Sequence, residues 1–140
     1  MMKISTKGRY ALRIMLDLAT NAKGSPVSLH DVAERQQITL KYMESIMSVL
    51  LQARFVTSTR GKAGGYRLSR EPQEYTVYEI LTIVEGDLAP VKCLEGPENP
   101  CPRQHLCLTL PLWQELDTVI KTYLQQHTLA DLQRNERKIH

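Results

Sequence analysis

Residues 55–68 carry the pattern that most restricts the fold of this chain of 140 residues. Two short runs of strand-forming residues stand on either side of a glycine-rich, cationic centre. The runs are Phe55-Val56-Thr57-Ser58-Thr59 and Tyr66-Arg67-Leu68, and the centre is Arg60-Gly61-Lys62-Ala63-Gly64-Gly65. β-Branched and aromatic residues favour strands, and a short glycine-bearing link between two strands favours a hairpin. The segment therefore predicts a β-hairpin with a positively charged tip.

Two predicted helices lie immediately before this hairpin. Ser28 begins a short helix over 29–35, and Thr39 begins a longer one with a polar first turn. The apolar stripe of the longer helix is Leu40, Met43, Ile46, Met47, Leu50 and Leu51. Two helices joined by a short link form a helix-turn-helix, and a hairpin placed directly after its second helix is a wing. We predict a mainly α fold with a small β-hairpin, the winged helix-turn-helix.

The rest of the chain predicts further helices and one long loop. A helix over about 6–22 comes first, and Thr76-Val77-Tyr78-Glu79 reads as a capping box that begins another helix, which Gly86 ends. From about residue 111 a long helix carries the apolar residues Leu112, Leu116, Val119, Ile120 and Tyr123, which we expect to pack against a second copy. The predicted units are 1–86, the DNA-binding domain; 87–110, a cysteine-bearing loop; 111–132, the dimerisation helix with a terminal turn; and 133–140, a disordered tail.

Charge is distributed unevenly along the chain. Residues 1–70 hold twelve Lys and Arg against four Asp and Glu, a net +8, whereas residues 71–140 hold six against eleven, a net −5. A basic half-chain suits a large anion such as nucleic acid. Charge alone leaves a solvated basic face as an equal alternative, but the wing after a helix-turn-helix favours double-stranded DNA.

The first turns of the second helix are the expected reading surface. The major groove of DNA admits an α-helix, and Thr39, Lys41, Tyr42 and Glu44 occupy the positions that would face base edges. A carboxylate such as Glu44 can accept a hydrogen bond from a cytosine amino group. The alternative is a surface residue that pairs with Lys41, three residues away.

Other cations suit the DNA backbone or the minor groove. Arg60 and Lys62 lie at the predicted wing tip, where an arginine favours the negative potential of a narrow minor groove. Lys7 and Arg9, at the start of the first helix, are expected to reach backbone phosphates. A solvated hairpin charge is the alternative for the wing.

Three cysteines mark the loop as a candidate metal centre. Cys93, Cys101 and Cys107 stand among proline, glycine and charged residues rather than in an apolar core. Thiolates select zinc, copper(I) or iron–sulfur clusters. His105 would complete a Cys₃His zinc set, although the cysteine spacing is wider than in paired zinc knuckles. An unliganded structural role remains a further alternative.

The cysteine count and the hydropathy pattern indicate a compartment. An odd number of cysteines fits a secreted disulfide framework poorly, so we expect a reducing cytoplasm. No apolar run approaches the roughly 18 residues of a membrane span. Arg13 interrupts the first apolar stretch, so we expect no signal peptide and no membrane association.

Four stretches resemble the family of winged-helix regulators that contains IscR, NsrR and CymR. They are Lys3-Ile4-Ser5-Thr6-Lys7-Gly8-Arg9-Tyr10-Ala11, Asp31-Val32-Ala33-Glu34-Arg35-Gln36, Leu40-Lys41-Tyr42-Met43-Glu44 and Arg60-Gly61-Lys62-Ala63-Gly64-Gly65-Tyr66-Arg67-Leu68. The resemblance runs from about residue 2 to 132, and Cys107-Leu108-Thr109 followed by Leu112-Trp113 is most similar to the IscR group.

This resemblance implies an iron–sulfur cluster on Cys93, Cys101 and Cys107, with [2Fe–2S] favoured over [4Fe–4S]. It also implies dimerisation through the long C-terminal helix, a palindromic operator, base reading by Glu44 and a wing contact by Arg60. The IscR pattern has a histidine ligand where this chain has Leu110, and the NsrR pattern has a carboxylate where it has Arg9. The fourth ligand is therefore open: His105, Glu95, Glu98 or a group from outside the chain.

The expected function is that of a homodimeric transcription regulator that senses iron–sulfur, redox or nitric-oxide status, with a small-molecule signal also open. One alternative is a clusterless regulator of cysteine or sulfur metabolism that acts with a protein partner, as CymR does. Another is a zinc-stabilised DNA-binding protein. A thiol-exchange enzyme is disfavoured because the chain has no C-x-x-C pair, so we expect no enzymatic activity.

Overall fold

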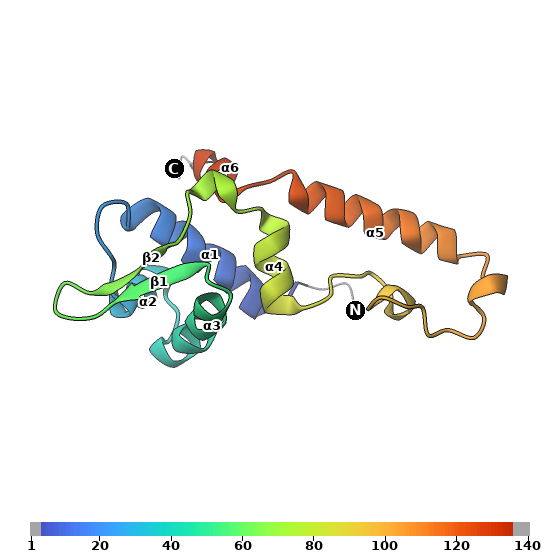
Figure 1. Ribbon diagram of the computed structural model, residues 1–140, viewed down its shortest axis with the longest axis horizontal. Helices are drawn as coiled ribbons and strands as arrows, with labels where there is room; N and C mark the ends of the chain where they lie inside the picture. Colours follow the sequence, from blue (N-terminus) through green and yellow to red (C-terminus); the bar gives the residue numbers. More distant parts are fainter. Residues whose placement is uncertain (1–3, 136–140) are drawn as a thin grey trace.

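Helix α1 (Thr6–Asn21) is the central support of the N-terminal half of the molecule (Figure 1). The computed structural model describes residues 4–135. After α1 follow α2 (Leu29–Gln36), α3 (Leu40–Gln52), β1 (Val56–Thr59), β2 (Gly65–Leu68), η1 (Pro72–Glu74), α4 (Val77–Glu85), η2 (Lys92–Leu94), η3 (Gln104–Leu106), α5 (Leu110–Gln125) and α6 (Leu129–Arg134). The predicted mainly helical fold with one antiparallel hairpin is confirmed.

Side-chain caps explain where the helices begin. The hydroxyl of Ser28 accepts the N–H of Asp31, and that of Thr39 accepts the N–H of Tyr42. Each cap satisfies one of the N–H groups that a helix leaves unpaired at its first turn. The two helices of the predicted helix-turn-helix therefore start where the sequence indicated.

The predicted capping box at the start of α4 is only half correct. Thr76 accepts the N–H of Glu79, as expected. The Glu79 carboxylate, however, accepts a hydrogen bond from Arg70 at 3.0 Å instead of returning to the cap residue. A charged partner offers the carboxylate a stronger hydrogen bond than a neutral amide does, which accounts for the difference.

The core lies where α1 meets α2, α3, α4 and α6. Its fully buried side chains include Ile14, Met15, Leu18, Val32, Met43, Ile46, Met47, Leu50, Tyr75, Ile80 and Leu129. Leu40, predicted in the buried stripe of α3, is instead 43% exposed. The first turn of α3 extends beyond the core, which this helix covers from Met43 onward.

A buried carboxylate joins α1 to α2. Asp17 is 5% exposed and accepts two hydrogen bonds from Arg35, at 3.0 and 2.7 Å. The side-chain amide of Gln36 donates a third, at 2.8 Å. A buried charge is tolerated only when it is paired and hydrogen-bonded, and this one is. These bonds fix the end of α2 against the middle of α1.

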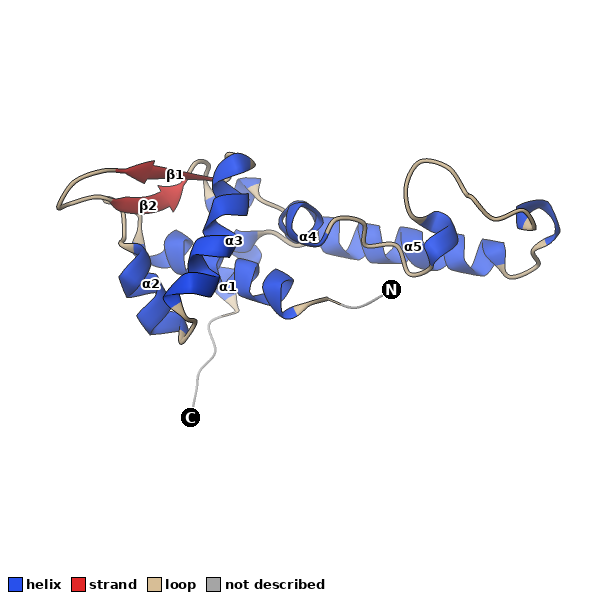
Figure 2. Ribbon diagram, turned by 90° about the horizontal axis from the view of Figure 1, so that it is seen from below, coloured by secondary structure: helices blue, strands red, loops and turns tan. Residues whose placement is uncertain are grey.

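A third chain segment pairs with the hairpin near its turn. Strands β1 and β2 pair from Val56↔Leu68 to Thr59↔Gly65. Val27 adds a bridge to Tyr66 through two backbone hydrogen bonds of 2.9 and 2.8 Å. The hairpin tip projects from the body on the side away from α5 (Figure 2).

Residues 86–125, the loop after α4 together with α5, form an arm that extends from the body, which is made of the other elements. From the end of α4 the chain runs outward to the far end of α5, and α5 then returns toward the body, where α6 packs (Figure 1). Helix α5 begins at Leu110, one residue before the predicted start, and α6 ends at Arg134, beyond the predicted limit of 132. Residues 136–140, most of the predicted tail, lie outside the described residues. Within the described part, no helix is long and apolar enough to span a membrane.

Two carboxylates organise the start of the arm. Glu85, the last residue of α4, accepts hydrogen bonds from the backbone N–H and the hydroxyl of Ser5, the cap residue of α1. Asp87 accepts the N–H of Gly96 and that of Ala89, both at 2.8 Å. The arm is thereby tied at its origin to the first turn of α1.

Gly65 provides a test of the contact between the hairpin and the segment at Val27. A Cβ added there would lie 2.3 Å from the carbonyl oxygen of Val27, and the φ of +153° disfavours any larger residue. We expect Gly65→Ala to lower the free energy of unfolding by about 1–3 kcal/mol, measured by thermal or urea unfolding. Gly24→Ala is the control, because an added Cβ meets nothing within 4 Å. Equal stability of the two variants would contradict this role of Gly65.

The hydrogen bonds that Asp87 accepts from the loop can be tested by their dependence on pH. The Gly96 and Ala89 N–H groups favour the ionised form and hold the pKa of Asp87 below its ordinary value of 3.8. A depressed pKa means that the stabilisation is present above the unfolded-state pKa and is lost as pH falls through the folded-state pKa. We expect the Gly96 amide NMR resonance to titrate with a midpoint below 3.8, and Asp87→Asn to abolish that titration. A midpoint at or above 3.8 would argue against these bonds.

Candidate nucleic-acid interface and cysteine loop

Helix α3 presents three of the four predicted reading residues to solvent. Thr39, Lys41 and Glu44 are exposed in its cap and first turns. Within residues 4–135, no ion pair joins Lys41 to Glu44, so the alternative in which these two residues pair has no support. Both charged groups are free to meet an external partner.

Tyr42, the fourth predicted reading residue, is half-buried. Its ring packs on Tyr10 of α1, with the ring centroids 5.6 Å apart and the planes tilted by 59°. The guanidinium carbon of Arg13 lies 4.9 Å from the centroid of the Tyr10 ring. Aromatic pairs in this geometry stabilise beyond their buried area. Tyr42 therefore helps to hold α3 on α1 as well as lying at the reading surface.

The wing tip carries exposed cations on a flexible backbone. Arg60 and Lys62 are exposed, and Gly61 between them has a φ of +105° that L side chains rarely adopt. In the first turn of α1, Lys7 is half-buried and Arg9 donates to the hydroxyl of Thr6 at 3.1 Å. The predicted backbone-contacting cations thus lie at two separate points of the body.

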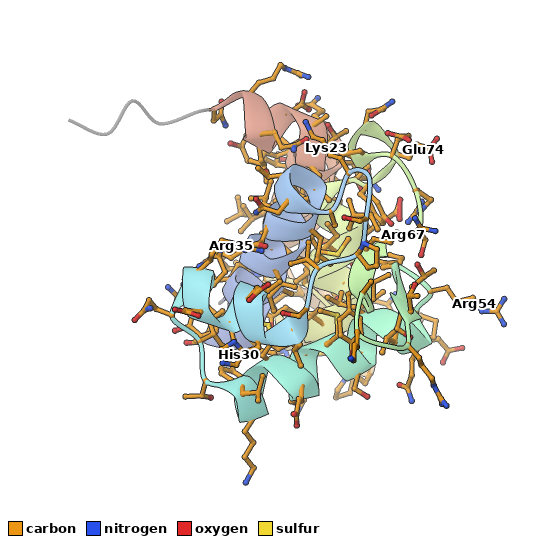
Figure 3. The ribbon with its side chains drawn as sticks, turned by 90° about the vertical axis from the view of Figure 1, so that its left-hand side faces the viewer. Lys23, His30, Arg35, Arg54, Arg67 and Glu74 are labelled. Atoms are coloured by element: carbon orange, nitrogen blue, oxygen red, sulfur yellow. The ribbon has the colours of Figure 1, made fainter. Side chains whose placement is uncertain are left out.

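Two further cations belong to this basic body and were missed from the sequence. Arg54, just after α3, is exposed with a φ of +62°, and Arg67 is exposed on β2. In Figure 3, which looks from the wing side, Arg54 points away from the molecule. Arg54 lies between the end of α3 and the start of β1, and this position in the sequence could have identified it as an exposed cation of the basic body. None of the ion pairs of the described chain uses the predicted or the missed cations, which are Lys7, Lys41, Arg54, Arg60, Lys62 and Arg67.

The three cysteines are free thiols, all partly exposed, on the segment between α4 and α5. The Cys107 sulfur lies 3.3 Å from the Thr109 hydroxyl. That hydrogen bond, with backbone N–H groups at the start of α5, lowers the pKa of the Cys107 thiol. A thiol near a helix N-terminus is more readily ionised, and the thiolate is the form that binds metals.

The loop between α4 and α5 does not bring the three thiols together into a metal-binding group. Within residues 4–135, no three His, Cys, Asp or Glu side chains converge as a metal-binding group. Local polar bonds hold the loop instead: the Asn99 side chain accepts the N–H of Cys101 at 2.9 Å. His105 is exposed within η3, and Leu110, which cannot ligate, is the first residue of α5. The donor chemistry fits a thiolate-bound centre, and closing the site requires the loop to move.

Helix α5 divides its apolar residues between two faces. Leu116 and Ile120 are half-buried on the side that meets α4, whereas Leu112, Val119 and Tyr123 are 57%, 63% and 59% exposed. These three residues, spaced 7 and 4 apart, form one stripe along the helix. Of the five residues predicted to meet a second copy, three are therefore available without disturbing the chain's own packing.

Comparison with known proteins identifies this architecture. The family model described as Rrf2, iron-dependent transcriptional regulator, matches residues 4–135. Protein rrf2 of Nitratidesulfovibrio vulgaris is 42% identical over 96% of this chain and 89% of its own length. Among solved structures, CymR of B. subtilis, a global cysteine regulator, superposes with a TM-score of 0.79 at 38% identity, covering 98% of this chain and 100% of CymR.

The IscR of T. potens is similar as well, with a TM-score of 0.76 at 32% identity over 99% of this chain and 92% of that protein. The resemblance noted from the four sequence stretches is thus confirmed, and these relatives are regulators of transcription rather than enzymes. With a family match over nearly its whole length and the winged helix in place, the chain belongs to the Rrf2 family of winged-helix transcription regulators.

Proposed function

We propose that the protein is a homodimeric regulator that binds a palindromic operator and holds an iron–sulfur cluster through Cys93, Cys101 and Cys107. The observation that carries this proposal is the combination of two features in one chain. A winged-helix body has cations without acidic partners, and an arm joined to it has three free thiols. The first feature suits a polyanion and the second suits a soft metal centre.

On DNA, α3 enters the major groove with its first turns. Thr39 and Lys41 donate to base edges or phosphates, and Glu44 accepts from a cytosine amino group. Arg60 and Lys62 meet the adjacent minor groove or its phosphates from the wing. Lys7 adds a phosphate contact from the start of α1. The wing and helix contacts together specify one half-site per protomer.

The second copy binds along α5. The stripe Leu112, Val119 and Tyr123 exposes apolar surface that a symmetric partner helix covers, and removal of this surface from water favours association. A two-fold axis through such an interface relates the two recognition helices. It therefore requires an operator with two inverted half-sites.

The thiolates of Cys93, Cys101 and Cys107 are the cluster ligands in this proposal, and His105 is the nearest candidate for the fourth position. A bound [2Fe–2S] cluster supplies a redox-active centre that responds to oxidants, nitric oxide or iron supply. The chain's own contribution is mechanical. Drawing three thiolates together shortens the loop, whose ends adjoin Asp87 and the first turn of α5. The loop's origin is also bonded to α1 through Glu85 and Ser5.

A second candidate is a clusterless regulator of cysteine or sulfur metabolism that acts with a protein partner. The similarity to CymR, named as a global cysteine regulator, favours it. In that case the thiols stay free, as they are in the described loop. A zinc-stabilised protein with a Cys₃His set is the third outcome that metal analysis distinguishes.

Substitution of one thiol separates these candidates. We expect anaerobically reconstituted wild type to contain iron and acid-labile sulfide with visible absorption, and Cys101→Ala to lose all three. Operator affinity of the variant should match the apo wild type and differ from the loaded form by about tenfold or more, or 1.4 kcal/mol. Leu108→Ala, which truncates a side chain of the same loop that is 96% exposed, should behave as wild type. A colourless wild type without iron would leave the second candidate, and bound zinc the third.

Glu44 provides a test of base reading. Removing its charge relieves repulsion from phosphates, so we expect Glu44→Ala to bind random duplex DNA more tightly. Discrimination between the operator and versions with single cytosine replacements should fall by about 1–3 kcal/mol at one position, measured by competition binding. Glu74→Ala removes the same charge on the side of the body away from α3 (Figure 3) and should leave discrimination unchanged. Equal discrimination by wild type and Glu44→Ala would exclude base reading by this residue.

A further inference from the structure

The hydroxyl of Tyr75 is a buried polar group that has no role in the proposed function. This residue is fully buried between η1 and α4. Its hydroxyl donates to the carbonyl of Phe55 at 2.6 Å and accepts the N–H groups of Ser69 and Arg70 at 3.1 and 3.0 Å. A phenol has one proton to donate and two lone pairs, so all of its hydrogen-bonding capacity is used.

These three bonds join the two ends of the wing hairpin. Phe55 immediately precedes β1, and Ser69 and Arg70 immediately follow β2. The Tyr75 ring packs edge-on against Phe55, with the centroids 5.4 Å apart. The Arg70 guanidinium carbon lies 4.3 Å from the centroid of the same ring. The base of the wing, where the Ser69 N–H also donates to the Phe55 carbonyl, is therefore reinforced by a side chain that belongs to neither strand.

The backbone of the same residue is joined to the arm. The carbonyl of Tyr75 accepts the N–H of Leu129, and the next residue but one, Val77, donates to the carbonyl of His127 at 2.8 Å. His127 lies in the link that follows α5, and Leu129 is the first residue of α6. His127 in turn packs on Tyr123, one of the exposed residues of the α5 stripe, with the ring centroids 4.6 Å apart. Tyr75 thus contacts the wing through its side chain and the start of α6 through its backbone, and Val77 beside it bonds to the link that follows α5.

We propose that Tyr75 is a positioning residue for DNA binding, which fixes the angle of the wing relative to α5. The proposal rests on the DNA-binding role assigned to the wing. In a dimer the α5 helices set the distance between half-sites, so a wing fixed relative to α5 meets the minor groove in register. A phenylalanine would fill the same space but leave the Arg70 N–H without its partner. The Phe55 carbonyl and the Ser69 N–H would each lose one of two bonds, because they also bond to each other at 3.2 Å, and the wing base would loosen.

The proposal makes Tyr75 act through Arg60, and a double-mutant cycle tests that dependence. Operator affinity is measured over a range of salt concentrations for wild type, Tyr75→Phe, Arg60→Ala and the double variant. We expect each single variant to bind about tenfold more weakly, with a salt slope shallower by about one phosphate contact. The double variant should bind no more weakly than Arg60→Ala alone, because a misplaced wing has no arginine contact left to lose.

Two controls keep the outcomes separate. Tyr78→Phe removes the hydroxyl of a half-buried tyrosine that has no side-chain hydrogen bond in the described chain, and it should match wild type. If Tyr75→Phe does not fold, Arg70→Gln replaces it in the cycle with the same expected coupling to Arg60. This change removes the guanidinium from the Tyr75 ring and its ion pair with Glu79, so Glu79→Gln, which removes the ion pair alone, is its control.

Additive losses, or a lower unfolding temperature with unchanged affinity of the folded protein, would overturn the positioning role and leave Tyr75 as a stabilising residue only. Arg60→Ala that binds as wild type does would remove the wing contact itself. Wild type that ignores duplex DNA would remove the proposed function. Each of these three failures is distinguishable from the others.

Discussion

The buried carboxylate of Asp17 is the interaction on which the placement of α3, the predicted DNA-reading helix, depends. Among the described residues it is the one charged side chain placed inside the core, and it is acceptable there because Arg35 and Gln36 satisfy it. The bonds fix the last turn of α2 on α1, and Gln37 then reverses the chain with a φ of +56° to start the recognition helix. The orientation of α3 therefore follows from a hydrogen-bonded charge in addition to apolar packing, and it is more specific than packing alone would make it.

Much of the body could be predicted because its determinants are local. A hydroxyl at each helix start, apolar residues at helical spacing and glycines at the hairpin tip act within a few residues of where they stand. Thr39 and the glycines of the wing needed no knowledge of the rest of the chain. Leu40 shows the limit of that reasoning, because spacing predicts which face a residue lies on but not how far the core reaches along the helix.

The contacts that could not be predicted are those between distant segments. Tyr75 is far in sequence from both Phe55 and Leu129. Nothing in its neighbours indicates that its phenol bonds to both ends of a hairpin while its carbonyl accepts from the first residue of α6. Glu79 was assigned to a local cap because its sequence position fits one, yet Arg70 competes for it more strongly. The three cysteines were identified by residue type, whereas whether a loop gathers them depends on the bound centre and on loop geometry, which residue types do not encode.

Body and arm are ordered by different forces, and that contrast bears on regulation. The body has a continuous core, whereas α5 has no buried residue and the loop before it is held by bonds from carboxylate and amide side chains such as Asp87 and Asn99. An element with little buried apolar surface takes its final arrangement from whatever binds it. In the proposed regulator these are a second α5 on one face and a thiolate-bound centre at the far end. Glu85 joins the start of the arm to α1, and His127 joins its end to Val77, beside the tyrosine that holds the wing base. A change in the loop or along α5 therefore reaches the body through these two contacts. Both contacts adjoin the elements that carry the cations proposed to face DNA. In the proposed regulator, an arm whose order depends on its ligands is therefore suited to control how the body meets DNA.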